Sequence, residues 1–172
     1  MDAEKQMTAE EFLAFAEQNP DKRFDFIDGE MVKIWPKPLN GRIQAILISV
    51  LSIYNQQNPI GVVYTETLHV LNGEKFIPDV CINVATDDDY LTAPPLVAVE
   101  IRSDSQSRAS QRRKARDYIR HSTKMVILTF PRENVEVYLS GQEPIILGED
   151  DVIDGGDVLP GFRLPVRDIL FK

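Results

Sequence analysis

The sequence has few of the residues on which several common classes of site depend. Its 172 residues include one cysteine, Cys81, which can form neither an intramolecular disulfide nor a cysteine-type zinc site. Cys81 lies in an apolar run and is expected to be a small buried side chain. The two histidines, His69 and His121, stand far apart and lack metal-ligand spacing. With no Gly-x-Ser-x-Gly element and no glycine-rich phosphate loop, the sequence argues against hydrolases and nucleotide-binding proteins of those types.

Long apolar runs are also missing. No stretch approaches the roughly 18 consecutive apolar residues that a membrane span needs. The first seven residues are polar and lack the apolar core of a secretory signal. We therefore expect no membrane association and, given the single cysteine, a reducing cytoplasmic compartment.

Positive charge is in deficit overall but concentrated in one segment. The net charge of -8 argues against a protein that coats nucleic acid without specificity. Residues 108–120, however, hold six of the 19 basic residues, opposed only by Asp117. The ordinary interpretation is a solvated helix face, and a nucleic-acid contact surface is the alternative. The basic residues are Arg108, Arg112, Arg113, Lys114, Arg116 and Arg120.

The first part of the chain predicts a helix, a hairpin and a second helix. Residues 8–11, Thr-Ala-Glu-Glu, form a capping box that starts a helix ending near Asn19. Alternating apolar residues on either side of Asp28-Gly29 predict a hairpin. Apolar residues then recur at helical spacing from Ile43 to Tyr54.

The rest of the chain predicts strands around one helix, within a single α/β domain that spans residues 1–172. Strands are expected at 61–71, 76–85, 96–101, 125–129 and 135–139, with a helix at 105–121 and a short one at 166–170. A strand, a helix and a strand in this order predict a βαβ crossover.

Two carboxylates interrupt apolar strands. Asp79 precedes the run Val80–Ile82, and Glu100 follows the run Leu96–Val99. An unpaired charge in such a place is costly to desolvate, so each carboxylate needs a cationic side chain, backbone amides or a divalent cation. A structural salt bridge is the ordinary interpretation of either residue alone. Two carboxylates on neighbouring strands also match the oxygen ligands that Mg²⁺ prefers.

Two further residues are candidates for the same site. Lys114 lies on the helix that must fold back over the strand of Glu100, where it could orient or activate a water molecule. Glu30, directly after the hairpin turn, is a further acid that could reach the site. A surface lysine in a basic helix and an exposed hairpin residue are the corresponding alternatives.

At these residues the chain resembles the Uma-two family of restriction endonucleases, a branch of the PD-(D/E)XK nuclease superfamily. The matching segments occur in the family's order and span nearly the whole chain. They are Met7–Phe12, Phe26–Val32, Ile77–Val80, Leu96–Ile101, Lys114 with Tyr118, and Leu159–Phe162 continuing to Asp168.

The resemblance implies a fold, a chemistry and roles. It implies a restriction endonuclease-like fold, with a central mixed β-sheet flanked by α-helices, and frequent homodimers. The implied activity is Mg²⁺- or Mn²⁺-dependent hydrolysis of DNA phosphodiester bonds. The implied catalytic residues are Asp79, Glu100, Lys114 and Glu30. The metal-binding positions are Asp79, Glu100 and Ile101, and the arginines expected to contact DNA are Arg108, Arg112, Arg113 and Arg116.

The chain also departs from the family pattern. Arg102 stands where the superfamily has its lysine, and Lys114 corresponds to a lysine that the family carries on the next helix. Residues 38–41 lack the histidine that the family often has there, and residues 102–105 read Arg-Ser-Asp-Ser instead of Leu-Ser-Pro-Ser. The alternative function is therefore a weakened or inactive relative that binds nucleic acid or a protein partner.

Overall fold

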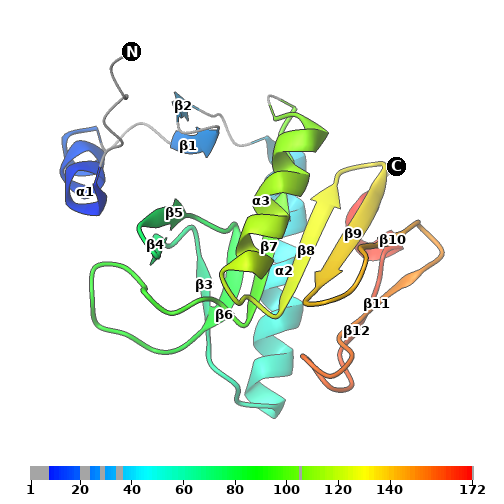
Figure 1. Cartoon of the computed structure of the whole chain (residues 1–172). Coiled ribbons are helices and arrows are strands. Elements are labelled where there is room, and N and C mark those ends of the chain that lie inside the picture. The colour runs from blue at the N-terminus through cyan, green and yellow to red at the C-terminus, as the bar shows by residue number, and fades with distance from the viewer. Residues whose placement is uncertain (1–7, 20–23, 28–29, 34–36, 105, 172) are drawn as a thin grey trace.

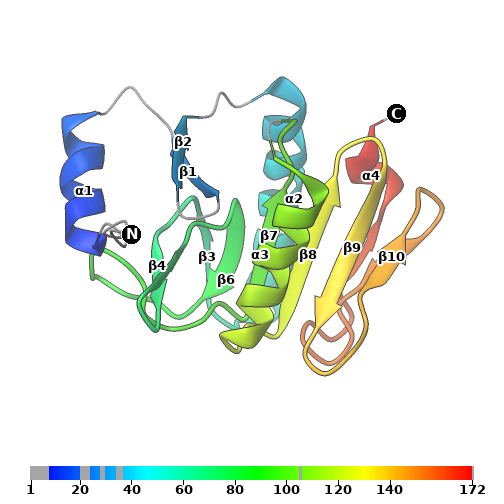
Figure 2. The ribbon, with the colours of Figure 1, turned by 45° about the horizontal axis from the view of Figure 1, so that its top comes forward.

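The computed structural model describes residues 8–19, 24–27, 30–33, 37–104 and 106–171, and for residues 9, 24–27 and 30–33 it describes the backbone alone. Six strands form a central mixed sheet with helices on both faces (Figures 1 and 2). The fold is the α/β class with a mixed central sheet that the sequence predicts. In spatial order the strands are β10 (Ile145–Leu147), β9 (Asn134–Leu139), β8 (Met125–Phe130), β7 (Val97–Ile101), β6 (Val80–Asn83) and β3 (Val62–Thr65).

The centre of the sheet is the crossover from β7 to β8 through helix α3 (Arg108–Arg120). β7 and β8 are parallel, whereas the other neighbouring strands of the sheet are antiparallel. Figure 1 shows α3 in front of these strands and helix α2 (Pro38–Gln57) behind them. The predicted βαβ crossover is thus confirmed.

The alternation of side chains along β7 divides the core into two layers. Val97, Val99 and Ile101 face α2 and belong to the larger apolar cluster. Ala98 faces α3 and belongs to the smaller cluster, with Ala115 and Tyr118 of that helix. Since strand side chains alternate between faces, Glu100 lies on the α3 side with Ala98. The central strand therefore carries one carboxylate into the layer beneath α3.

Both sheet-covering helices form for local reasons. α2 has a proline in its first turn, and its buried residues Ile43, Leu47, Leu51 and Tyr54 repeat at helical spacing. α3 starts at Ser107, whose hydroxyl oxygen accepts a hydrogen bond from the backbone N–H of Ser110 at 3.0 Å. Among the described residues, no helix has the length and apolarity that crossing a membrane requires.

The N-terminal elements lie on the side of the sheet where β3 is the edge strand (Figures 1 and 2). Helix α1 (Ala9–Gln18) starts with the predicted capping box, in which Thr8 and Glu11 exchange hydrogen bonds. Strands β1 (Phe24–Ile27) and β2 (Glu30–Lys33) form the predicted antiparallel pair, and the turn at 28–29 lies outside the described residues. α1 packs through Phe12 against Leu68, which precedes β4.

Two predicted strands are each divided in the structure. The segment 61–71 forms β3 and β4 (His69–Leu71), and the segment 76–85 contributes to β5 (Glu74–Phe76) and β6. The break in the first segment lies at Glu66, whose φ of 48° is outside the extended region. β4 and β5 pair with each other through the Asn72-Gly73 turn, where both residues have positive φ as a type I′ hairpin turn requires.

The C-terminal part contains three strands that the sequence does not reveal. β10, β11 (Val152–Asp154) and β12 (Arg163–Pro165) have three residues each, too few for alternation to show. The predicted terminal helix is α4 (Arg167–Leu170), and Ile169 and Leu170 bury it against the α2 side.

Substitution of Leu47 tests the α2-side core. Leu47 is fully buried, so Leu47→Ala leaves a cavity and should lower the free energy of unfolding by about 2–5 kcal/mol. Ile53→Ala is the matched control on the same helix, because Ile53 is 56% exposed; its effect should stay within about 0.5 kcal/mol. Urea unfolding followed by circular dichroism measures both values. Equal losses in the two variants would contradict the assignment of these helix faces.

Candidate active site

Asp79, directly before β6, lies beside Glu100 of the neighbouring strand β7. The antiparallel register pairs Val80 of β6 with Val99 of β7, so Asp79 and Glu100 are the residues that follow this pair toward the same end of the sheet. The Oδ2 atom of Asp79 accepts a hydrogen bond from the backbone N–H of Ile101 at 2.6 Å. Asp79 is half-buried, and Glu100 is 3% exposed. The two carboxylates that the sequence singles out are therefore neighbours at one end of the sheet.

Helix α3 supplies two hydrogen-bond donors to Glu100. The Nζ atom of Lys114 is 2.9 Å from Oε2, and the hydroxyl of Tyr118 donates to Oε1 at 2.8 Å. Residues four apart lie on the same side of a helix, so one face of α3 presents both groups to β7. Lys114 does fold back over the strand of Glu100, as the sequence predicts.

Tyr118 is held in its neutral, donating form. Its side chain is fully buried, and burial raises the pKa of its phenol well above the ordinary value because a buried phenolate is poorly solvated. The negative charge of Glu100 raises this pKa further. Glu100 thus receives one hydrogen bond from a cation and one from a neutral hydroxyl, which compensate its burial.

The carboxylate oxygens of this site are the kind of ligand that a hard divalent cation requires. Asp79 and Glu100 offer carboxylate oxygens, and Mg²⁺ is commonly held by one or two carboxylates together with water and substrate phosphate. A carboxylate has about four lone-pair positions, so the hydrogen bonds from Lys114 and Tyr118 leave room for a cation to bind as well. Within the described ranges, no group of three or more His, Cys, Asp or Glu residues could hold a metal ion.

Ile101 and Glu30, the other two acidic or metal-binding positions predicted from the sequence, do not place a described carboxylate at this site. The side chain of Ile101 packs in the α2-side core, so its backbone carbonyl oxygen is the only atom that it could offer to a metal ion. Glu30 is the first residue of β2, but its side chain lies outside the described part of the chain. Ile101 is therefore limited to a backbone role, and the role of Glu30 stays a prediction.

The arginines of α3 divide into two groups. Arg112 forms a forked pair with Glu136 of β9, its Nε and NH2 atoms donating at 3.1 and 2.6 Å. Arg108 forms an ion pair with Glu133. Arg113 and Arg116 are exposed. Of the four arginines expected to contact DNA, Arg108 and Arg112 thus have their guanidinium groups at carboxylates on or just before β9, whereas the side chains of Arg113 and Arg116 are exposed.

Glu136 is the second buried carboxylate on the α3 side. It is 2% exposed, and burial alone would raise its pKa. Hydrogen bonds from Arg112 and from the hydroxyl of Tyr138, at 2.7 Å, outweigh burial and lower the pKa below its ordinary value. Glu136 thus remains ionised in the fold, with Arg112, the more distant Arg108 and Tyr138 around it, a setting of cation and tyrosine that is similar to that of Glu100.

Several of these contacts were missed by sequence reasoning. Glu136 stands between Val135 and Val137, the same signal that draws attention to Glu100. Tyr118 stands four residues after Lys114, and this helical spacing could have assigned both to one face. No local signal marks Gln44 of α2, whose Nε2 atom donates to the backbone carbonyl of Asp79 at 2.9 Å.

Comparisons with known proteins agree with this fold. The Uma2 family model, described as "Putative restriction endonuclease", matches residues 9–167. A crystal structure from Anabaena variabilis, described as a "putative nuclease belonging to DUF820", is similar with a TM-score of 0.80 and 21% sequence identity. The similarity covers 95% of this chain and 97% of that chain, and at this identity it shows the fold alone. No curated protein matches the chain.

The pairing of Arg112 predicts that two nearby arginines of α3 contribute unequally to the free energy of unfolding. Arg112→Ala removes the forked pair and leaves the buried Glu136 with Tyr138, Asn134 and the more distant Arg108 at 3.8 Å, so the free energy of unfolding should fall by about 1–3 kcal/mol. Arg116→Ala, one helical turn later on an exposed position, should change it by about 0.5 kcal/mol or less. Thermal and urea unfolding measure both. A small loss in Arg112→Ala would mean that the forked pair adds nothing to the fold.

Proposed function

The chain belongs to the Uma2 family of restriction endonucleases, and from this membership we propose that it is a divalent-metal-dependent endonuclease that hydrolyses DNA phosphodiester bonds. The observation that carries the proposal is the 2.9 Å contact between Lys114 and the buried Glu100, with Asp79 directly before the neighbouring strand β6. A lysine and two carboxylates at one end of a sheet are the groups that such hydrolysis needs.

The carboxylates would hold the metal ion. Asp79 and Glu100, with the backbone carbonyl of Ile101, would bind Mg²⁺ or Mn²⁺. When bound, such an ion lowers the pKa of a water molecule and neutralises charge that develops on the phosphate. Tyr118 and Lys114 keep the carboxylate of Glu100 oriented, because each holds one of its oxygens.

Lys114 has a second role in the proposed reaction. Its ammonium group lies at the rim of the buried layer, with its side chain 16% exposed, so it can contact both Glu100 and a water molecule from solvent. There it would orient the attacking water toward the phosphate. Arg102, at the superfamily's usual lysine position, directs its guanidinium group elsewhere and donates to Glu133 at 3.2 Å.

The exposed arginines of α3 are the proposed phosphate contacts. Arg113 and Arg116 are exposed on the helix that carries Lys114, so DNA bound along this helix would bring its backbone near the candidate site. Arg108 and Arg112, which pair with Glu133 and Glu136, would support the helix instead. This local concentration of positive charge reconciles the acidic net charge with a polyanionic substrate.

Isosteric substitutions test the metal-dependent activity. Wild type should nick supercoiled plasmid in the presence of Mn²⁺ and not in the presence of EDTA. Asp79→Asn and Glu100→Gln should each lower the rate by about 10²-fold or more, because each removes a charge proposed to bind the cation. Asp157→Asn, an exposed carboxylate in the C-terminal region, is the matched control and should keep the wild-type rate.

The outcomes of this assay separate the alternatives. Cleavage that persists in both Asp79→Asn and Glu100→Gln would show that the site is wrongly assigned. A wild-type protein that binds DNA but cleaves none with Mg²⁺ or Mn²⁺ would instead be an inactive relative that has kept the fold.

A salt titration tests the proposed phosphate contact of Arg116. Without divalent cations, Arg116→Ala should weaken binding to a DNA duplex and lower the slope of log K against log salt by about one. Arg167→Ala is the matched control, since Arg167 is 62% exposed on α4, which packs on the α2 side of the sheet. Fluorescence anisotropy over a range of salt concentrations gives both slopes. Equal slopes in Arg116→Ala and wild type would remove Arg116 from the DNA-contacting surface.

A further inference from the structure

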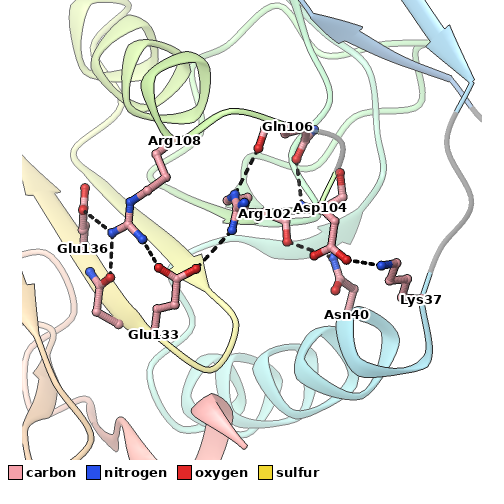
Figure 3. Close-up of polar contacts among 10 residues, drawn as sticks. Lys37, Asn40, Arg102, Asp104, Gln106, Arg108, Glu133 and Glu136 are labelled. Atoms are coloured by element: carbon pink, nitrogen blue, oxygen red, sulfur yellow. Dashed lines mark hydrogen bonds and ion pairs between the residues drawn. The ribbon is translucent and has the colours of Figure 1, made fainter. Parts of the chain in front are cut away.

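The connection between β7 and α3 is fixed at its start by Arg102 (Figure 3). The backbone N–H of Arg102 donates to the carbonyl of Thr129 at 3.0 Å, which continues the ladder between β7 and β8. Its Nε atom donates to the carbonyl of Gln106 at 3.0 Å, and its NH1 atom donates to Glu133 at 3.2 Å. One guanidinium group therefore ties the end of the strand both to the connection itself and to the turn between β8 and β9.

The carboxylate of Glu133 also fixes the end of this connection, at the start of α3. Arg108, the first residue of α3, forms an ion pair with Glu133 through its NH1 atom and donates to the side-chain oxygen of Asn134 at 2.9 Å. Its guanidinium carbon lies 4.0 Å from the ring centroid of Phe130. Figure 3 shows Glu133 between the two arginines, with one carboxylate oxygen directed to each.

The turn that carries Glu133 is itself anchored. The backbone N–H of Glu133 donates to the carbonyl of Phe130, and that of Arg132 donates to the carbonyl of Leu170 in α4, both at 3.0 Å. Glu133 thus stands on a turn that is held by the sheet and by the C-terminal helix. From this fixed turn, the side chain of Glu133 links Arg102, which directly follows β7, to Arg108, the first residue of α3.

We propose that Glu133 is a positioning residue, which clamps α3 against β7 through Arg102 and Arg108 and so keeps Lys114 on Glu100. The proposal deepens the proposed function and rests on it for the role of Lys114. A lysine carried by the same strand as the acid would be placed by that strand alone. Lys114 instead comes from α3, so its distance from Glu100 depends on where that helix starts. The clamp sets this start.

The arginine at position 102 suits this task. Its planar fork donates to two acceptors in different directions, whereas a lysine offers a single nitrogen. Because the side chain of Glu133 is 48% exposed, the ion pairs add little to the free energy of folding. The clamp therefore acts on geometry more than on stability.

Amine labelling of the full-length protein tests the clamp without any need for nuclease activity. In wild type the contact with Glu100 should protect Lys114 from an amine-reactive reagent, relative to the exposed Lys124. Glu133→Gln keeps the shape of the side chain but removes its charge, and it should speed labelling of Lys114 by about fivefold or more. Glu143→Gln, an exposed glutamate, is the matched control and should leave the labelling rate unchanged. Peptide mass spectrometry gives the rate at each lysine.

Arg102→Gln provides a second variant, which removes one arm of the clamp. It should also speed labelling of Lys114, while labelling of Lys124 stays as in wild type. Labelling of Lys114 that is unchanged in both variants would overturn the proposal. Equal acceleration at Lys114 and Lys124 would do the same, because it would indicate general loosening of the fold.

A double-mutant cycle then tests whether the clamp acts through Lys114. Glu133→Gln should lower the cleavage rate by about tenfold in wild type and have no further effect in Lys114→Met, because the group that it positions is gone. An equal loss in both backgrounds would contradict the proposal. If wild type cleaves no DNA, the proposed function fails, and the labelling rates alone decide whether the clamp exists.

Discussion

The charge of Glu100 lies inside the molecule, on the central strand of the sheet. Its neighbours on β7 are apolar, and water reaches little of its side chain, so the compensation must come from the layer packed above. Helix α3 supplies it through Lys114 and Tyr118. This one requirement accounts for the placement of that helix over β7 and for the presence of a lysine in a mostly buried position.

The same solution is used twice on the α3 side of the sheet. Glu100 is paired with a lysine and a tyrosine, and Glu136 with an arginine and a tyrosine. The two sites differ in their neighbours across the sheet, because Glu100 has Asp79 beside it and Glu136 has Ile146. A buried carboxylate with its cation is therefore only half of the candidate site. The second carboxylate is what makes the Glu100 end suitable for a divalent ion.

Much of this arrangement could be predicted from the sequence, for identifiable reasons. The helical spacing of α2, the capping box of α1 and the apolar strand of β7 are local patterns, and each appears in the structure where the pattern places it. Asp79 and Glu100 could be singled out because charge on an apolar strand is costly. Lys114 is singled out mainly by the family resemblance, because the return of the crossover helix over its own strand does not specify which of its basic residues reaches Glu100.

The remaining features depend on contacts between distant segments. The carboxylate partners of Arg108 and Arg112 stand on the turn before β9 and on β9 itself, more than 20 positions further along the chain, and no local pattern links them. The division of segment 61–71 into β3 and β4 depends on one residue with positive φ, which a strand-like composition conceals. β10, β11 and β12 are too short to show a period and form only because other strands are present to pair with them.

The separation of the candidate groups along the chain has a consequence for folding. Asp79, Glu100 and Lys114 come from three separate segments of the chain, and their contacts form only when β6 has paired with β7 and the crossover through α3 has closed. Such long-range pairings are late events compared with the formation of a single helix. A nascent or partly folded chain therefore lacks this cluster altogether. Any cleavage that depends on it would begin only once the domain has matured.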